Sequence, residues 1–401
     1  MDYISVKVAA ERWGVTVRRV QQLCKAGLIS GATKFGKSWM VPKDAILPSE
    51  EAATGADIPN GLPDVFQLTP FRQAMPLLCS SFEPGHCMEY IRSLPDEDDR
   101  NIALGEYYHF SGQAEKATRI LEPYLDSHDP ALRYSASLVC SFANLSRGHI
   151  HLAHFAMQNL QTQVRIGLKS DSPPKLHAMG ILTATAASVL LHMPLPDMPP
   201  LRDYLRYLPG GLKLWGCYVL AHQAYLEKDY AGALAMAEMG LALSPEPYPI
   251  AEIYVRLVAV MALMNLKQSE KARAHMDAAW KLAREDDLIE AFGEHHGLLQ
   301  GMIEVYFQKD YPKDFERIIA ITYAFSAGWR KVHNPETRHD VADNLTTTEF
   351  TIAMLYSRGW SGKEIGAHMG LSDRRIRDHL AVIYEKLGVN RREELNQFML
   401  I

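Results

Sequence analysis

The sequence is poor in cysteine and lacks a long hydrophobic run. Its five cysteines are odd in number and show no C-x-x-C spacing, so we expect neither a disulfide framework nor a zinc site of that kind. The longest apolar run, Gly180 to Leu191, is too short to cross a bilayer and is followed by His192 and Pro194. Charged residues interrupt the N-terminal stretch, which argues against a signal peptide. These features predict a cytoplasmic protein without a membrane partner.

Residue sets with catalytic or metal-binding spacing are also lacking. His149 and His151 would diverge by about 200° on a helix, so these two and His154 cannot converge on one ion. No nucleophile, paired acid or metal set converges elsewhere in the sequence. We therefore predict that the chain is not an enzyme and holds no metal or cofactor.

One phosphate-binding pattern is present, but its context is wrong. Residues 31–38, GATKFGKS, fit the pattern G-x-x-x-x-G-K-[ST]. A phosphate loop needs a buried strand before it and a helix after it. Here a helix is expected before the pattern, and Pro42 would interrupt a helix that followed it. We therefore assign Lys34 and Lys37 to a β-hairpin wing.

The C-terminal residues 345–401 carry the start and stop signals of three short helices. Thr346 with Glu349, and Ser361 with Glu364, are two capping boxes at helix starts. Ser372 is expected to cap the third helix. The expected stop signals are glycines that can adopt the left-handed conformation: Gly359, Gly370 and Gly388. The third helix has an apolar stripe at helical spacing: Ile376, Leu380, Ile383 and Leu387.

The side of the third helix opposite this stripe is rich in arginine. At about 100° per residue, Arg374 and Asp378 lie opposite the stripe, while Arg375 and Arg377 flank it. A recognition helix enters the major groove with its N-terminal half, where arginine donates two hydrogen bonds to guanine or contacts phosphate. The pattern is therefore typical of a DNA-binding helix-turn-helix. A solvated arginine face is the alternative for a helix considered alone.

This segment resembles the LuxR-type (GerE-like) helix-turn-helix of bacterial transcriptional regulators, and the spacing is kept without a gap. The matching residues are Leu345, Thr346, Glu349, Gly359, Ser361, Lys363, Glu364, Ile365, Leu371, Ser372, Ile376, His379, Leu380, Ile383, Lys386, Leu387, Gly388, Val389 and Arg392. The resemblance implies that five residues lie at or near DNA: Lys363, Arg374, Arg375, Arg377 and His379. It also implies a helix after Asn390 that often mediates homodimers. Arg375 replaces the usual threonine and Gly366 the usual alanine, so the preferred base sequence stays open.

Residues 1–48 form a second compact basic unit. Val6 to Trp13 predict one helix, Thr16 caps a second helix, and Ile29 to Val41 predict a hairpin wing. The candidate DNA contacts of this unit are Arg18, Arg19, Gln22, Lys25, Lys34 and Lys37. The unit resembles the small winged helix-turn-helix of excisionase and MerR-like proteins, which implies a second DNA contact. A domain used for protein contact is the alternative.

Residues 64–333 show a repeated helical pattern between linkers at residues 49–63 and 334–344. Gly112 and Ala117 fit the spacing of a tetratricopeptide unit, and Gly148 and Ala153 repeat the same relation further along the chain. The length allows about seven helix pairs. We predict an all-α fold, in which a tetratricopeptide-like helical solenoid is flanked by two small helix-turn-helix DNA-binding domains, the N-terminal one with a short β wing.

Charge is distributed in the same three parts. The net charge is +5 over residues 1–48, −11 over residues 49–344 and +1 over residues 345–401, out of −5 in total. Basic ends on an acidic body fit a protein that touches nucleic acid at its termini. The sequence thus predicts a bacterial transcriptional regulator that binds double-stranded DNA, with RNA polymerase as a further partner and an unknown peptide, protein or small-molecule effector in the helical region. The alternatives are a regulator that senses a pheromone-like peptide and an adaptor that binds no DNA.

Overall fold

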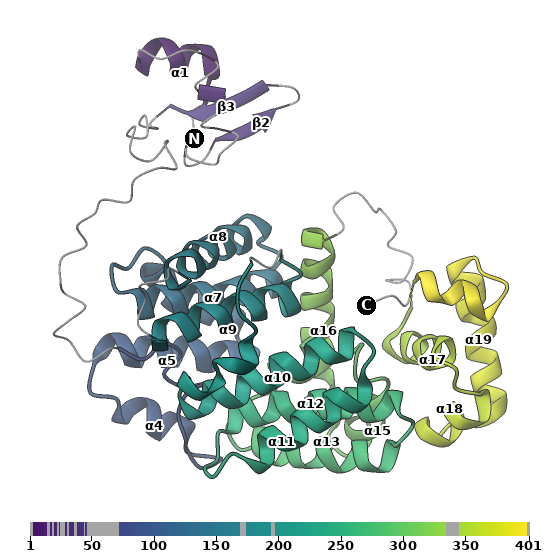
Figure 1. Cartoon of the computed structure of the whole chain (residues 1–401). Coiled ribbons are helices and arrows are strands. Elements are labelled where there is room, and N and C mark those ends of the chain that lie inside the picture. The colour runs from purple at the N-terminus through teal and green to yellow at the C-terminus, as the bar shows by residue number, and fades with distance from the viewer. Residues whose placement is uncertain are drawn as a thin grey trace. The chain divides into compact units, whose positions relative to one another are not determined.

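The chain is divided into two compact units, Met1–Arg72 and Gln73–Ile401. The computed structural model (Figure 1) describes residues 3–13, 17, 20, 21, 24, 29, 32–35, 38–43, 45, 72–168, 174–193, 197–333 and 345–398.

The described residues of the first unit include the helix α1 and a three-stranded antiparallel sheet. Strand β1 (Tyr3–Ser5) leads into α1 (Val6–Trp13), and β2 (Thr33–Phe35) and β3 (Ser38–Pro42) form a hairpin. The strand order is β1-β3-β2. The helix and the hairpin lie where the sequence predicts them, whereas β1 was not predicted because three residues carry little periodicity. Since β2 and β3 occupy the described part of the G-x-x-x-x-G-K-S pattern, that pattern is not a phosphate loop.

The described residues of the second unit form helices joined by turns and loops, with no strand among them, which confirms the all-α prediction. Its body consists of α4 (Cys87–Ser93), α5 (Glu97–Phe110), α6 (Ala114–Leu121), η2 (Glu122–Tyr124), α7 (Pro130–Ser146), α8 (Ile150–Gly167), α9 (Pro174–Leu191), η3 (Leu201–Asp203), η4 (Leu205–Tyr207), α10 (Gly210–Leu226), α11 (Tyr230–Ala242), α12 (Pro249–Asn265), α13 (Ser269–Ala283), α14 (Glu290–Glu294), α15 (Met302–Phe307) and α16 (Pro312–His333). The C-terminal elements are α17 (Thr347–Ser357), α18 (Gly362–Met369), α19 (Asp373–Leu387) and η6 (Arg392–Gln397).

Four helix pairs in the described body are joined by the same tight turn. The pairs are α5/α6, α7/α8, α10/α11 and α12/α13, and each turn has one residue with positive φ: Gly112, Gly148, Lys228 or Lys267. In each turn the next amide N–H donates to the carbonyl five residues earlier, at 2.7–2.9 Å, as in a Schellman motif. The glycine turns were visible in the sequence. The lysine turns were not, because lysine rarely adopts this conformation.

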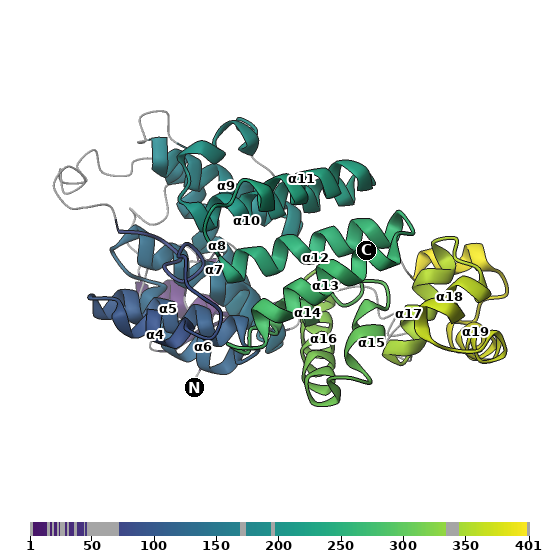
Figure 2. The ribbon, with the colours of Figure 1, turned by 90° about the horizontal axis from the view of Figure 1, so that it is seen from below.

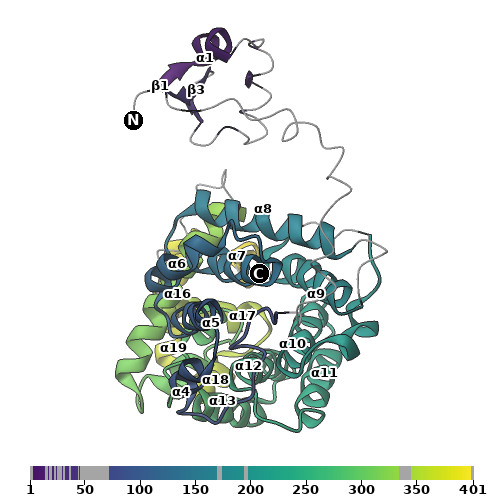
Figure 3. The ribbon, with the colours of Figure 1, turned by 90° about the vertical axis from the view of Figure 1, so that its left-hand side faces the viewer.

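Helix α16 packs back against α7 and α8, and α14 packs against α5 and α12. Figure 3 shows α16 beside α7, although most of the body lies between them in sequence. Gly328 permits this contact, because a Cβ there would lie 1.9 Å from the Leu145 carbonyl oxygen. Figure 2 shows the row formed by α10 to α13. Because α14 and α16 pack against α5, α7 and α8, the last helices of the body lie beside its first helices.

Helix α9 is longer than the apolar run within it. Among the described residues it is the one helix whose length and composition would allow it to cross a membrane, and 61% of it is buried inside the protein. It packs against α8 and α10. This burial is what a core helix of the body requires.

Candidate nucleic-acid interface

The first two helices of the C-terminal domain begin with the predicted capping boxes. The Thr346 N–H donates to Glu349 Oε2 at 2.8 Å, and the Glu349 N–H donates to Thr346 Oγ1 at 3.2 Å. Ser361 and Glu364 make the same reciprocal pair at 2.7 and 3.2 Å. Each box satisfies two backbone donors that the first turn leaves without a helical acceptor. The boundaries of α17 and α18 are thus encoded locally.

A tight turn joins α18 to α19. Gly370 ends α18 with φ +66, and the Ser372 hydroxyl accepts from the Arg375 N–H at the start of α19. A Cβ on Gly366 would lie 2.7 Å from the Leu371 carbonyl oxygen. The alanine that is usual in the resembled family would therefore crowd this turn, and glycine allows a closer approach of α18 to the chain entering α19.

Helix α19 has one buried and one exposed side, as its sequence predicts. Three members of the predicted stripe are buried, Ile376, Ile383 and Leu387, and Leu380 is half-buried. The exposed residues of the opposite side and its flanks are Arg374, Arg375, Arg377, Asp378, Ala381 and Glu385. Lys363 of α18 is exposed as well, and His379 is half-buried. The predicted C-terminal DNA contacts therefore lie on α19 and the start of α18.

The arginine-rich face has one internal ion pair. Arg377 Nη1 lies 3.1 Å from Asp373 Oδ2, and the two side chains are 70% and 42% exposed. An exposed pair of this kind contributes little to stability, because water and salt screen it. A phosphate or a guanine edge can therefore compete for Arg377 at small cost.

A different surface of the domain contacts the helical body. Arg358 Nη1 donates to the Tyr225 hydroxyl and to Asn265 Oδ1, both at 2.9 Å. Lys267 Nζ donates to the Gly359 carbonyl at 3.3 Å and to Glu364 Oε1 at 3.2 Å. None of these C-terminal residues is a predicted DNA contact.

Apolar packing extends this contact. One continuous cluster of buried apolar side chains includes residues of both the body and the C-terminal domain. Gly301 of the body lies so close that a Cβ on it would meet Thr351 at 2.6 Å and His368 at 3.6 Å. In this arrangement the domain is packed on the body while the arginine face of α19 stays exposed.

The segment after Asn390 is the 3-10 helix η6, and it packs within the domain. Its Leu395 is fully buried. Arg392 donates from Nε to the Tyr356 carbonyl at 2.6 Å and lies 4.4 Å from the centroid of the Tyr356 ring. The short element that the resemblance assigns to dimer contacts thus also stabilises α17.

The candidate contacts of the N-terminal unit are scarcely described. Arg18, Arg19, Gln22, Lys25 and Lys37 lie outside the described residues. The Lys34 backbone lies in β2, opposite Trp39 of β3, and its side chain is not described. The assignment of Lys34 to the wing agrees with this register.

Sequence reasoning missed a group of polar residues inside the body: His109, Glu290 and Glu294. Burial lowers the pKa of His109 to about 4. Burial and the nearby Glu294 carboxylate together raise the pKa of Glu290 well above its usual value. The signal in the sequence was the pair of glutamates four residues apart in an apolar stretch, since a buried acid needs a partner. The exposed histidines 149, 151 and 154 are not part of this group.

A row of packed rings leads from this group toward the C-terminal domain. Tyr254 donates to Glu294 Oε2 at 3.0 Å, and the Tyr254 and Tyr218 rings are 5.1 Å apart. His222 follows at 5.6 Å from Tyr218, and Tyr225 at 6.1 Å from His222. Tyr225 is the residue that accepts from Arg358, so the contacts are continuous from the buried acids to α17.

Comparison with known proteins agrees with the C-terminal geometry. Residues 343–399 match the family model described as "Bacterial regulatory proteins, luxR family". A stretch of 54 residues, 14% of this chain, is 35% identical to the "Probable transcriptional regulatory protein SgaR" of Hyphomicrobium methylovorum. That stretch covers 26% of the relative's length. No solved structure matches the chain. The C-terminal segment is therefore a LuxR-family helix-turn-helix domain, which is a regulatory DNA-binding domain.

Proposed function

We propose that the chain is a DNA-binding transcriptional regulator that reads duplex DNA through α19. The observation that carries this proposal is the exposure of Arg374, Arg375 and Arg377 on a helix whose opposite side is buried in a LuxR-family domain. A regulatory role also follows from the match of this domain to the family of bacterial regulators. The matched family is one of regulatory proteins, and the match gives no support for an enzymatic activity.

In the proposed complex, the N-terminal half of α19 enters the major groove. Arg374 and Arg377 lie within its first turns and donate to guanine edges or phosphates, with Arg377 leaving Asp373. Lys363 contacts a phosphate from the start of α18, and Arg375 adds a second phosphate contact. Asp378 and His379 follow on the next turn and contribute to base selection. The planar guanidinium group of arginine makes directional hydrogen bonds in addition to its charge interaction. Because the net charge of the domain is low, its DNA binding depends on such directed contacts.

The remaining parts of the chain have proposed roles that rest on their sequence patterns. Residues 1–48 would be a second, winged helix-turn-helix DNA-binding domain, joined by residues 49–63 to the helical region at 64–333. That region, a tetratricopeptide-like solenoid, would bind an effector or protein partner and pass the signal through residues 334–344 to residues 345–401. Two weak DNA sites on one chain gain from effective concentration. We expect the regulator to act in the cytoplasm, as a homodimer that contacts RNA polymerase.

Selection of bound duplexes from a random DNA pool tests the assignment of α19. Wild type is compared with Arg374→Ala/Arg377→Ala and with a control, Arg119→Ala/Arg202→Ala, which removes the same charge from body side chains that are each 75% exposed. We expect wild type and the control to enrich one motif, and the α19 variant to lose or relax it. Equal enrichment by both variants would move recognition away from α19. No enrichment by any of them, at low as well as moderate salt, would favour the adaptor or a regulator that needs its effector first.

Deletion of residues 1–48 tests the two-site proposal. The full chain should bind its selected duplex more tightly than the truncated chain, with a steeper dependence on salt concentration. An unchanged affinity and salt slope would remove the N-terminal unit from the proposed DNA contact and leave α19 as the reader.

A further inference from the structure

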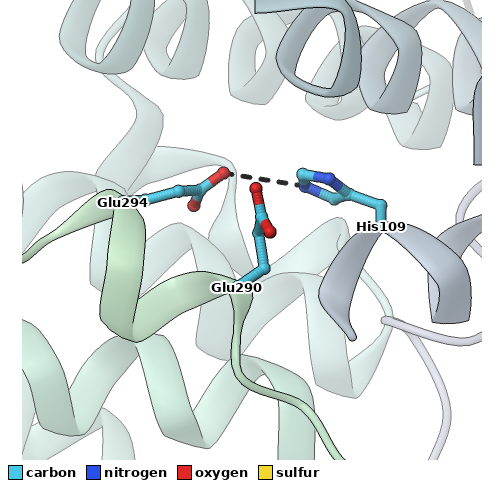
Figure 4. Close-up of side chains that lie close together, drawn as sticks. All are labelled: His109, Glu290 and Glu294. Carbon is cyan, nitrogen blue, oxygen red and sulfur yellow. Dashed lines mark ion pairs between the residues drawn. The ribbon is translucent and has the colours of Figure 1, made fainter. Parts of the chain in front are cut away.

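Three side chains meet inside the body, where the end of α5 faces α14. We call them the triad: His109 from the last turn of α5, and Glu290 and Glu294, four residues apart on α14 (Figure 4). One ligand atom from each residue can be chosen so that all three lie within 4.8 Å of one another. His109 Nε2 is 3.8 Å from Glu294 Oε1, and the Glu290 carboxylate points toward the space between the other two.

The triad is enclosed by protein. His109 is 4% exposed and Glu290 1%, and the Glu294 side chain is 7% exposed. Two carboxylates held this close and away from water repel each other and lose their hydration, which costs several kcal/mol per ion unless a positive charge compensates. No lysine or arginine ion pair with either carboxylate is found among the described residues. The charge of the two carboxylates is therefore not balanced by a basic side chain among the described residues.

One carboxylate oxygen of each glutamate accepts a hydrogen bond from a neighbour, whereas the Glu294 oxygen that faces His109 does not. The Tyr254 hydroxyl donates to Glu294 Oε2 at 3.0 Å, and the Ser146 hydroxyl donates to Glu290 Oε1 at 3.1 Å. Glu294 Oε1, which faces His109 Nε2, is buried without a hydrogen-bond partner. Buried polar atoms are almost always satisfied, so the orphaned Glu294 oxygen beside His109 indicates a missing partner.

We propose that His109, Glu290 and Glu294 bind one divalent first-row transition-metal cation, of which Zn²⁺ is the best probe. One imidazole nitrogen with two carboxylate oxygens is a ligand set that suits such ions, whereas the imidazole disfavours Mg²⁺ and Ca²⁺. A charge of +2 neutralises the two carboxylates. The hydrogen bonds from Tyr254 and Ser146 orient the ligands in the way that outer partners do in metal sites.

The consequence of such a site is structural. His109 lies near the beginning of the body, and the two glutamates lie near its end, so the ion would join α5 to α14 where the body returns on itself. An ion that binds the folded chain and not the unfolded chain stabilises the fold by mass action. The chain would then be most stable when loaded.

The test uses the full-length protein, stripped with a chelator and titrated with Zn²⁺, and with Co²⁺ as a spectroscopic probe. Wild type is compared with Glu290→Gln and Glu294→Gln. The matched control is Glu304→Gln, because Glu304 and His296 form a buried pair at 2.9 Å that belongs to no three-ligand group among the described residues. The surface histidines are the same in every protein compared, so any metal that they bind is a common background. The measured quantity is the equivalent of metal that is bound beyond this background.

We expect one tight equivalent per chain, a rise in melting temperature on loading, and Co²⁺ bands without thiolate character. Glu290→Gln and Glu294→Gln should weaken this equivalent about 100-fold or more, while the control keeps it. If a triad variant does not fold, X-ray absorption of loaded wild type decides, since the proposal requires a shell with a single imidazole and only oxygens besides. Wild type that binds no such equivalent, or triad variants that keep it, would overturn the proposal and leave two carboxyls that share protons.

Discussion

Arg358 Nη1 lies 2.9 Å from the Tyr225 hydroxyl oxygen and connects the end of α17 to α10 of the body. The same nitrogen donates to Asn265 Oδ1. Arg358→Ala should therefore loosen the C-terminal domain locally, by about 1–3 kcal/mol for lost hydrogen bonds from a charged donor. Hydrogen exchange should become faster in α17 and α18 and stay unchanged in α12. Affinity for the selected DNA should be kept, because Arg358 is not a predicted DNA contact.

The control for this prediction is Arg391→Ala. Arg391 is 75% exposed and pairs with Glu394 inside its own domain. If the amide hydrogens of α17 and α18 exchange at the same rate in the two variants, the hydrogen bonds of Arg358 do not hold the domain on the body.

Lys363→Ala should weaken DNA binding to a similar extent for every sequence. A lysine that contacts phosphate displaces about one counterion, so the slope of log Kd against log salt should fall by about 1. Binding titrations at several salt concentrations measure this slope. Lys309→Ala, an exposed lysine of the body, serves as the control and should leave it unchanged. A Lys363 variant with the wild-type slope but a new preferred motif would assign this residue to base reading.

Stability should depend on Glu364 at acid pH. Hydrogen bonds from the Ser361 N–H and hydroxyl, and then Lys267, lower the pKa of Glu364 to about 2 from its usual 4.5. A depressed pKa means that the ionised form stabilises the fold above pH 4.5, and that this contribution is lost as the pH falls toward 2. The melting temperature of wild type should thus exceed that of Glu364→Gln at pH 6, and the difference should shrink below pH 4.5. A difference that is constant with pH would mean that charge is not the cause.

Lys228→Gly should stabilise the body. Lys228 is an exposed residue with φ +65 in the turn between α10 and α11. A side chain in this conformation costs about 1 kcal/mol, which glycine avoids at the expense of a more flexible unfolded chain. We expect a net gain of about 0.5 kcal/mol by chemical denaturation.

Lys267→Gly is the informative comparison for that prediction. Lys267 has φ +56 in the equivalent turn between α12 and α13, but its ammonium group also contacts Gly359 and Glu364. Lys267→Gly should therefore raise the free energy of unfolding less than Lys228→Gly does, or should lower it. An equal gain at both positions would show that the Lys267 contacts contribute nothing.

The elements that the sequence predicted well are those fixed by neighbouring residues. The two capping boxes, the glycine stops at 370 and 388 and the stripe from Ile376 to Leu387 each depend on residues within a few positions, and all are present. The hairpin of the first unit also lies where predicted. The left-handed lysine turns were not predictable in this way, because packing of the helix pairs on both sides overrides the local preference of lysine.

The contacts that the sequence did not predict join residues far apart in the chain. His109 meets Glu290 and Glu294, and Tyr225 meets Arg358, only because α14 and α17 return to helices formed much earlier. The period of a helix does not encode such pairs. A single histidine or glutamate in the sequence has the pattern of a surface residue, because its distant partner is not visible.

The sequence by itself determined the caps, the turns and the arginine face of α19, because hydrogen bonds within one helical turn and the period of the helix decide them. Only the tertiary structure decided which surface of the C-terminal domain rests on the body and which acids are buried together. Those outcomes depend on shape complementarity and on desolvation of groups brought from distant parts of the chain, and neither is a property of a short segment.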